Sequence, residues 1–174
     1  MKSESIRKMV TAALFAALVC VSTLVVLSYS ATGYIHLGDC FVLVAGWILG
    51  PMWGTAAAAV GSILTDLFLG YAVYIPATFI IKGLMAATAF WVMSLMRGSG
   101  RAVNIIKYLI SALVAELIMV VGYFGYEVFL YGAPGALANI IPNLIQGLSG
   151  MVFASLVIHP VMKIRYFREM CGRE

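Results

Sequence analysis

The sequence predicts an all-α membrane protein, a bundle of six transmembrane helices with both termini in the cytoplasm. Of the 174 residues, 63% are hydrophobic and only 10% are charged, and the mean hydropathy is +1.04. This composition is far from that of a soluble domain. The complete apolar runs have the length of helices that cross roughly 30 Å of hydrocarbon. The basic residues, described below, gather on one side of the predicted bundle.

The first three helices are predicted from apolar runs and the breaks between them. One helix runs from about residue 6 to 27, and a polar connection over 28–38 follows it. The segment 39–50 is too short for a straight span, so a short or partly sunken helix is expected. Gly50 and Pro51 end this segment and begin a helix over 51–69, because glycine suits a left-handed cap and proline suits the first helical turn.

The second half of the chain predicts three more helices. Gly70 and Tyr71 turn the chain into a helix that has Pro76 in its first turn and continues to about residue 96. The last two helices cover 103–130 and 137–163, separated by the turn YGAPGA. No polar segment is long enough for a second folding unit, so residues 1–174 are expected to form a single integral membrane domain.

The basic residues predict the orientation of the bundle. Of the eleven Lys and Arg residues, all except Lys82 fall near the termini or in the connection around residues 97–107. These positions share one side of the six-helix arrangement, which the positive-inside rule makes cytoplasmic. The net charge of +4 is thereby explained by topology, and no nucleic-acid partner is expected.

Lys82 is predicted to lie inside the membrane, where an ionisable side chain costs at least about 2.5 kcal/mol and therefore needs a partner or a function. Helical spacing aligns it with Tyr74 and Thr78. Two further polar stripes follow the same spacing, Glu116, Tyr123 and Glu127 over 103–130, and Asn139, Asn143 and Gln146 over 137–163. We expect these stripes to form an outward-facing polar pocket roughly 10 Å below the surface. The alternative is interhelical hydrogen bonding without a ligand.

Several carboxylates are candidates for the partner of Lys82, namely Asp66, Glu116 and Glu127. Asp66 and Glu127 lie near outer helix ends and could simply face water, whereas Glu116 lies near mid-membrane and leaves a proton-coupled carrier open. Asp39 is interpreted as the N-cap of the segment that follows it, and His36 is a possible ligand contact. The candidate ligand contacts are Lys82, Tyr74, Thr78, Asn139, Asn143, Gln146, Tyr123, Glu127, Asp66, His36 and Asp39.

Small residues form one face of the first predicted helix near its cytoplasmic end. Ala12, Ala13, Ala16 and Ala17 make two overlapping small-xxx-small pairs, which permit close approach of another helix. That helix could be the segment 51–69 or a partner protein. Motifs of hydrolases, metalloproteases and nucleotide-binding enzymes are absent from the sequence. We therefore expect no catalytic residue, no metal and no cofactor, and we interpret the three cysteines as packing residues.

Three stretches of the sequence, GYIHLGD, GPMWGTAAAAVGSILTDLFLGY and YIPATFIIKG, resemble the substrate-binding S components of energy-coupling factor (ECF) vitamin transporters. The resemblance implies a small membrane protein of the prokaryotic plasma membrane that captures a water-soluble vitamin from outside. It also implies as partners a transmembrane coupling protein and two ATPases, with the alanine face as the docking surface and residues 28–38 as a roof over the ligand.

Riboflavin, pyridoxine and the hydroxymethylpyrimidine part of thiamin are the ligands that such a resemblance suggests. The lysine, amides and tyrosines of the stripes suit a neutral, hydroxylated heteroaromatic ring, and the short loops favour a small pyridine or pyrimidine over riboflavin. A riboflavin-specific S component, a solitary proton-coupled carrier and a structural membrane protein remain as alternatives.

Overall fold

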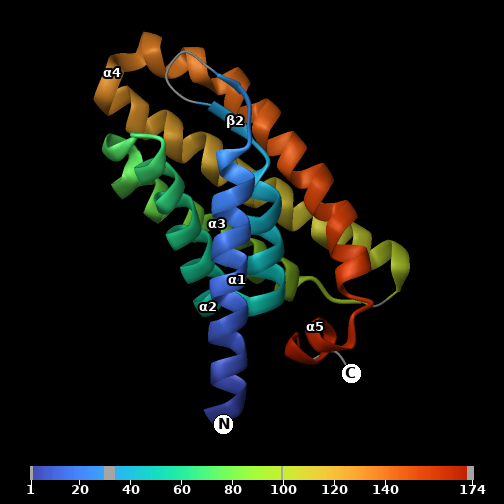
Figure 1. Cartoon of the computed structure of the whole chain (residues 1–174). Coiled ribbons are helices and arrows are strands. Elements are labelled where there is room, and N and C mark those ends of the chain that lie inside the picture. The colour runs from blue at the N-terminus through green and yellow to red at the C-terminus, as the bar shows by residue number, and fades with distance from the viewer. Residues whose placement is uncertain (1, 30–33, 99, 172–174) are drawn as a thin grey trace.

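The computed structural model is a helical bundle with both chain termini at one end and a short hairpin at the other (Figure 1). It describes residues 2–29, 34–98 and 100–171. Within these ranges four helices are long and apolar enough to cross a membrane. They are α1 (Lys2–Leu24), α2 (Gly38–Phe68), α3 (Ile75–Leu95) and α4 (Arg101–Val161). The predicted all-α membrane class is confirmed at this level.

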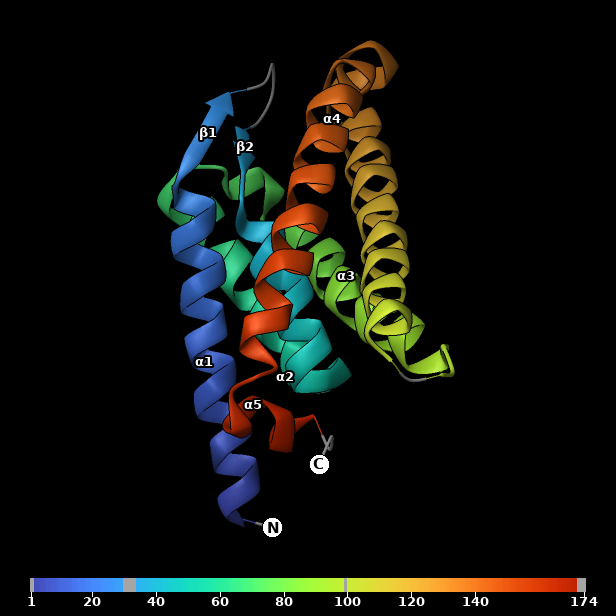
Figure 2. The same cartoon turned by 90° about the vertical axis from the view of Figure 1, so that its right-hand side faces the viewer.

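A single glycine interrupts each of the two longest helices. Gly50 in α2 has φ 78° and ψ −175°, and Gly132 in α4 has φ 75° and ψ 170°, conformations that glycine adopts without steric cost. Pro51 follows the first break and Pro134 the second. Both breaks lie where the sequence predicted helix ends. The two halves of α4 consequently fold back on each other as an antiparallel hairpin (Figure 2).

The connection after α1 contains a small antiparallel hairpin that the sequence did not predict. β1 (Val26–Tyr29) pairs with β2 (Tyr34–His36), so α1 ends at Leu24, a few residues earlier than expected. Residues 30–33 of the predicted roof lie outside the described ranges. The hairpin leads directly into α2 (Figure 2). A hydrogen bond from the Gly38 amide to His36 Nδ1 places His36 beside the first turn of that helix.

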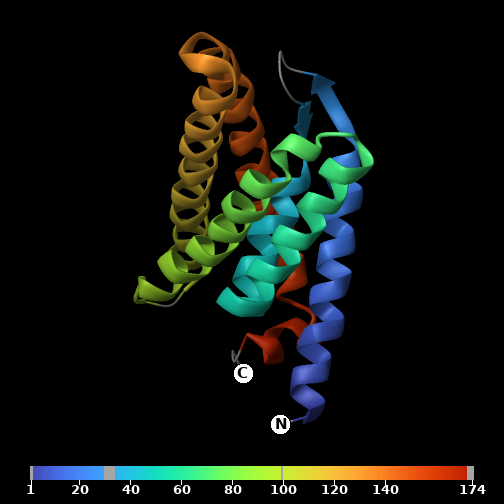
Figure 3. The same ribbon diagram turned by 90° about the vertical axis from the view of Figure 1, so that its left-hand side faces the viewer.

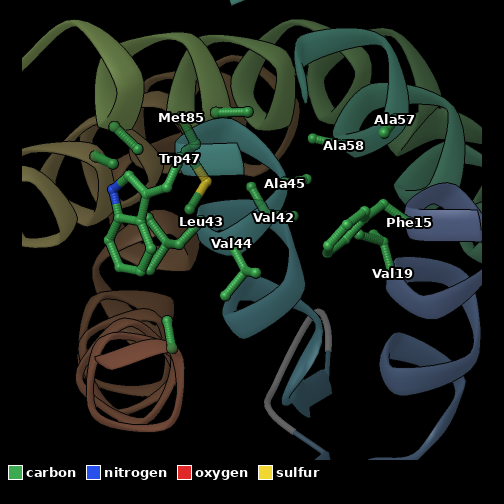
Figure 4. Close-up of a cluster of buried hydrophobic side chains, with 14 of the residues drawn as sticks. Phe15, Val19, Val42, Leu43, Val44, Ala45, Trp47, Ala57, Ala58 and Met85 are labelled. Carbon is green, nitrogen blue, oxygen red and sulfur yellow. The ribbon is translucent and has the colours of Figure 1, made fainter. Parts of the chain in front are cut away.

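Helix α2 lies between α1 and α3 and forms the centre of the fold (Figure 3). From Gly38 to Leu49 every residue except Phe41 is buried, and this first half of α2 carries much of the apolar core (Figure 4). A Cβ on Gly46 would come within 2.4 Å of the Ala86 carbonyl oxygen of α3. The absence of side chains at such positions is what lets the helices approach this closely.

Two short helices complete the described chain. The 3₁₀ helix η1 (Ala72–Tyr74) precedes α3, and α5 (Arg165–Met170) follows α4. The Tyr166 hydroxyl lies 2.7 Å from Thr11 Oγ1, and the Arg7 guanidinium lies 4.7 Å from the centre of the Tyr166 ring. These contacts fasten the C-terminal segment to the start of α1.

Candidate functional site

A buried ion pair lies at the junction of three helices. Lys82 on α3 is 2% exposed and Asp39 at the start of α2 is 0% exposed. The Lys82 ammonium donates a hydrogen bond to Asp39 Oδ1, and Gln146 Nε2 on α4 donates to Asp39 Oδ2 over 2.7 Å. Both carboxylate oxygens are therefore satisfied by side chains from other helices, as a buried charge requires.

This arrangement corrects two predictions. Asp39 is not the N-cap of α2, because the cap residue is Leu37 and no side chain makes a capping hydrogen bond there. Asp39 already lies inside the first turn, where its carboxylate turns inward to the ammonium. The partner of Lys82 is also not one of the three suggested carboxylates, since its ion pair is with Asp39. The sequence analysis gave Asp39 a capping role and therefore did not consider it as the partner of Lys82.

A polar cavity of about 570 Å³, part of it open to solvent, lies beside this ion pair. Its lining residues come from the end of α1, β2, the second half of α2, η1, α3 and both halves of α4. The hairpin and the turn between the halves of α4 lie at the end of the bundle opposite the termini (Figure 1). The lining residues of the cavity are Thr23, His36, Ser62, Asp66, Tyr71, Tyr74, Thr78, Lys82, Tyr123, Glu127, Asn139, Asn143 and Gln146. Every candidate ligand contact named from the sequence lines this cavity except Asp39, which accepts hydrogen bonds from the lining residues Lys82 and Gln146.

Three lining residues were missed by the sequence analysis. Ser62 lies four residues before Asp66 in α2, so the helical spacing used elsewhere could have found it. Tyr71 was expected at the turn before the next helix and was not among the candidate ligand contacts. Thr23 lies in the last turn of α1, and no pattern in the sequence distinguishes it from a packing residue.

Tyrosines make one wall of the cavity. Tyr74 and Tyr123 lie with ring centres 6.3 Å apart, and Tyr71 packs edge-on against Tyr74 at 6.1 Å. The Tyr74 hydroxyl donates to Glu127 Oε1 over 3.2 Å, and the Tyr123 hydroxyl donates to Thr78 Oγ1 over 3.2 Å. These bonds hold the rings in place, so the wall offers rigid aromatic surface to a flat ligand.

His36 is held in a single neutral form. Its Nδ1 accepts a hydrogen bond from the Gly38 amide over 2.9 Å, so the proton of the neutral ring is on Nε2. Burial lowers the pKa of His36 to about 4, and the attraction of Asp39 only partly offsets this. His36 therefore contributes a hydrogen-bonding ring to the cavity and no charge at neutral pH.

Glu116 does not belong to this cavity. Its side chain lies between the two halves of α4, where a Cβ on Gly147 or Gly150 would come within 3.1 Å or 2.9 Å of its carboxylate oxygens. Within the described part of the chain neither Glu116 oxygen has a hydrogen-bond partner. It borders a separate groove whose other lining residues are apolar or glycine, among them Leu117 and Leu144. The stripe of Glu116, Tyr123 and Glu127 is thus divided between two environments.

The alanine face of α1 is also divided. Ala12 and Ala16 are buried, whereas Ala13 and Ala17 are exposed. A Cβ on Gly61 of α2 would lie 2.4 Å from the Ala16 carbonyl oxygen, so the buried pair serves an internal helix contact. The sequence analysis gave an internal helix contact and a partner-docking surface as alternatives. The buried alanines make the internal contact, and the exposed alanines are accessible to a partner.

The chain matches a known protein family over most of its length. A model of the family described as "ECF-type riboflavin transporter, S component" matches residues 3–163. A Pyrococcus woesei protein described as "Uncharacterized protein in gap 3'region" is 29% identical over 123 residues, which cover 71% of this chain and 78% of that protein.

Two solved structures share the fold at 19% sequence identity and a TM-score of 0.70. One is the S component of a bacterial ECF transporter, and the similarity covers 91% of this chain and 97% of that chain. The other is ThiT from Listeria monocytogenes, for which the corresponding shares are 94% and 98%.

Proposed function

This chain belongs to the family of ECF-type riboflavin transporter S components, and from that membership we propose that it captures a water-soluble vitamin in the polar cavity described above. It is a multi-pass membrane protein and the substrate-binding subunit of a vitamin transporter, not an enzyme. The observation that carries the proposed site is the ion pair of Lys82 and Asp39, which lies beside a cavity lined by amides and tyrosines.

The proposed membrane topology has six spans with both termini in the cytoplasm of a prokaryotic cell. Breaks at Gly50 and Gly132 divide α2 and α4 into two helical pieces each, which supports six crossings from four continuous helices. The basic residues near the termini and around 97–107 support the orientation. In this arrangement residues 1–174 act as one membrane domain, and the cavity opens to the outside.

The proposed partners are a transmembrane coupling protein and two ATPase subunits. The chain has no phosphate-binding glycine loop, so ATP hydrolysis would have to come from other subunits. The exposed residues Ala13 and Ala17 on α1 offer a flat surface for helix packing. We propose this surface as the contact with the coupling protein.

The proposed ligand is a vitamin with a small pyridine or pyrimidine ring, such as pyridoxine or hydroxymethylpyrimidine. The description of the matching family favours riboflavin as the alternative, and the tyrosine wall suits either flat ring. A solitary proton-coupled carrier receives less support, because Glu116, on which it would depend, lies outside the cavity.

Mass spectrometry of the purified protein tests this function. Protein extracted in mild detergent is expected to carry a stoichiometric vitamin, and Asn143→Ala protein is expected to carry less of it. Asn104→Ala makes the same change at the opposite end of the bundle and serves as the control. Empty protein that binds no water-soluble vitamin on addition would contradict the proposed function.

A further inference from the structure

The charge of Lys82 is already matched inside the protein. Its ammonium donates to Asp39 Oδ1, and both side chains are almost fully buried. An anionic ligand would therefore have to compete with Asp39, which Gln146 also holds in place. The Lys82 ammonium can still donate a hydrogen bond toward the cavity, but the pair of Lys82 and Asp39 brings no net charge to a ligand.

Two further carboxylates line the same cavity. Glu127 is 4% exposed and Asp66 is 5% exposed. Glu127 Oε1 accepts from the Tyr74 hydroxyl, while for Glu127 Oε2 the described residues provide no hydrogen-bond partner. An ionised carboxylate oxygen that is buried without a partner is strongly unfavourable unless something neutralises it.

The elements around the cavity contain no second basic side chain that could do so. Lys82 is the only Lys or Arg between residues 9 and 96 and between residues 108 and 162. His36 is neutral because burial lowers its pKa to about 4. Hydrogen bonds to the carboxylates do not remove their charge, so besides protonation a cationic ligand is the group that can balance Glu127 in this cavity.

The aromatic wall is suited to the same kind of ligand. The rings of Tyr74 and Tyr123 lie 6.3 Å apart on the side of the cavity where Tyr74 bonds to Glu127. Tyrosine faces attract cations and stack on flat rings. A ring with a positive group can therefore contact the aromatic wall and Glu127 at once.

We propose that the captured ligand is an aromatic or heteroaromatic cation, whose positive group donates to Glu127 Oε2 while its ring packs against Tyr74 and Tyr123. This inference rests on the proposed function and specifies the substrate class of the same cavity. It narrows the pyridine and pyrimidine ligands proposed above to those that carry a positive group, because the expectation of a neutral ring did not include the internal partner of Lys82.

A series of probes with one ring and three charges tests the proposal. Pyridoxamine carries an ammonium, pyridoxine a hydroxymethyl group and 4-pyridoxate a carboxylate at the same ring position. Thiamin, a permanent cation, and riboflavin, a neutral ring, extend the series. Binding is measured at pH 7 by calorimetry and thermal shift on the detergent-purified chain. We expect the cations to bind at least about tenfold tighter than the neutral rings, and 4-pyridoxate to bind most weakly.

Two variants locate the effect. Glu127→Gln keeps the size of the side chain and is expected to remove the preference for cations. Glu169→Gln makes the same charge change at an exposed position of α5 outside the cavity, and is expected to retain the preference. Should Glu127→Gln protein unfold, the wild-type probe series still decides the charge of the ligand.

The outcomes separate this inference from the proposed function. Tightest binding of a neutral or anionic probe would overturn the cationic ligand and leave vitamin capture intact. An unchanged preference in folded Glu127→Gln protein would overturn the role of that carboxylate. If no probe bound, vitamin capture would fail, and the cationic ligand would fail with it.

Discussion

Lys82 and Asp39 form a buried ion pair between residues 43 positions apart, and it joins the start of α2 to α3. Gln146 reaches the same carboxylate from α4, across 107 positions. Helices in a lipid environment gain little from hydrophobic burial against one another, so packing and polar contacts of this kind determine how they assemble. The pair therefore fastens the helices that form the cavity.

Breaking this pair is expected to destabilise the protein strongly. Lys82→Met or Asp39→Leu alone leaves an uncompensated buried charge, which costs about 3–5 kcal/mol. The double variant is expected to lose less than the sum of the single variants, because both charges disappear together. Thermal unfolding in detergent measures the three variants. As a control, Arg165→Gln breaks the exposed pair of Arg165 and Glu169 and should change the midpoint of thermal unfolding little. If the effects of the Lys82 and Asp39 variants were additive, the two side chains would not be energetically coupled.

Asn143→Ala is expected to weaken ligand binding without affecting the fold. Asn143 is half-buried on the cavity wall, so its amide is available to a ligand. Loss of one hydrogen bond of about 1–1.5 kcal/mol lowers affinity roughly tenfold. Calorimetric titration with the vitamin identified by mass spectrometry gives the change in Kd. An unchanged Kd would remove Asn143 from the binding site.

Gly61→Ala is expected to destabilise the contact between α1 and α2. The added methyl group would lie 2.4 Å from the Ala16 carbonyl oxygen and 2.8 Å from Val19 Cβ, and relieving such overlap costs about 1–3 kcal/mol. Gly125→Ala is the matched control, because a Cβ there meets nothing within 4 Å. The control should be neutral or stabilising by up to about 1 kcal/mol. Equal unfolding midpoints for the two variants would refute the close approach.

Large side chains on the exposed half of the alanine face are expected to block transport and spare binding. Ala13→Leu and Ala17→Leu project into the surface proposed for the coupling protein, so vitamin uptake by cells should fall at least about tenfold while the Kd of the purified chain stays constant. Ala12→Leu and Ala16→Leu act on the buried half and should lower thermal stability. Normal uptake in the Ala13 and Ala17 variants would show that the partner docks elsewhere.

Acid is expected to destabilise the protein partly through His36. Its pKa is lowered from about 6.5 to about 4 by burial, so between these values the unfolded chain binds a proton that the folded chain excludes. Stability therefore falls as the pH drops from about 6.5 to 4, and this contribution is fully present above pH 6.5. His36→Gln removes the titration and should flatten this part of the curve of unfolding midpoint against pH. A curve of the same slope in the variant would contradict the burial of a neutral ring.

Much of the fold was predictable from local patterns. The apolar runs predicted helices of membrane length, and the breaks at Gly50 and Gly132 followed from the backbone preferences of glycine and proline. The resemblance to S components, based on the motifs between residues 33 and 83, is confirmed by the family match over residues 3–163. Polar spacing also selected most of the residues that line the cavity. These features depend on the identity and spacing of nearby residues.

The sequence by itself thus determined that the chain is a helical membrane protein, where its helices break, and which faces of them are polar. Only the tertiary structure decided that Lys82 pairs with Asp39, that Glu116 lies outside the cavity, and that Ala12 and Ala16 are buried while Ala13 and Ala17 are exposed. The physical reason is that helical periodicity relates residues within one helix, whereas the rotation and depth of one helix against another depend on side-chain packing across the whole bundle.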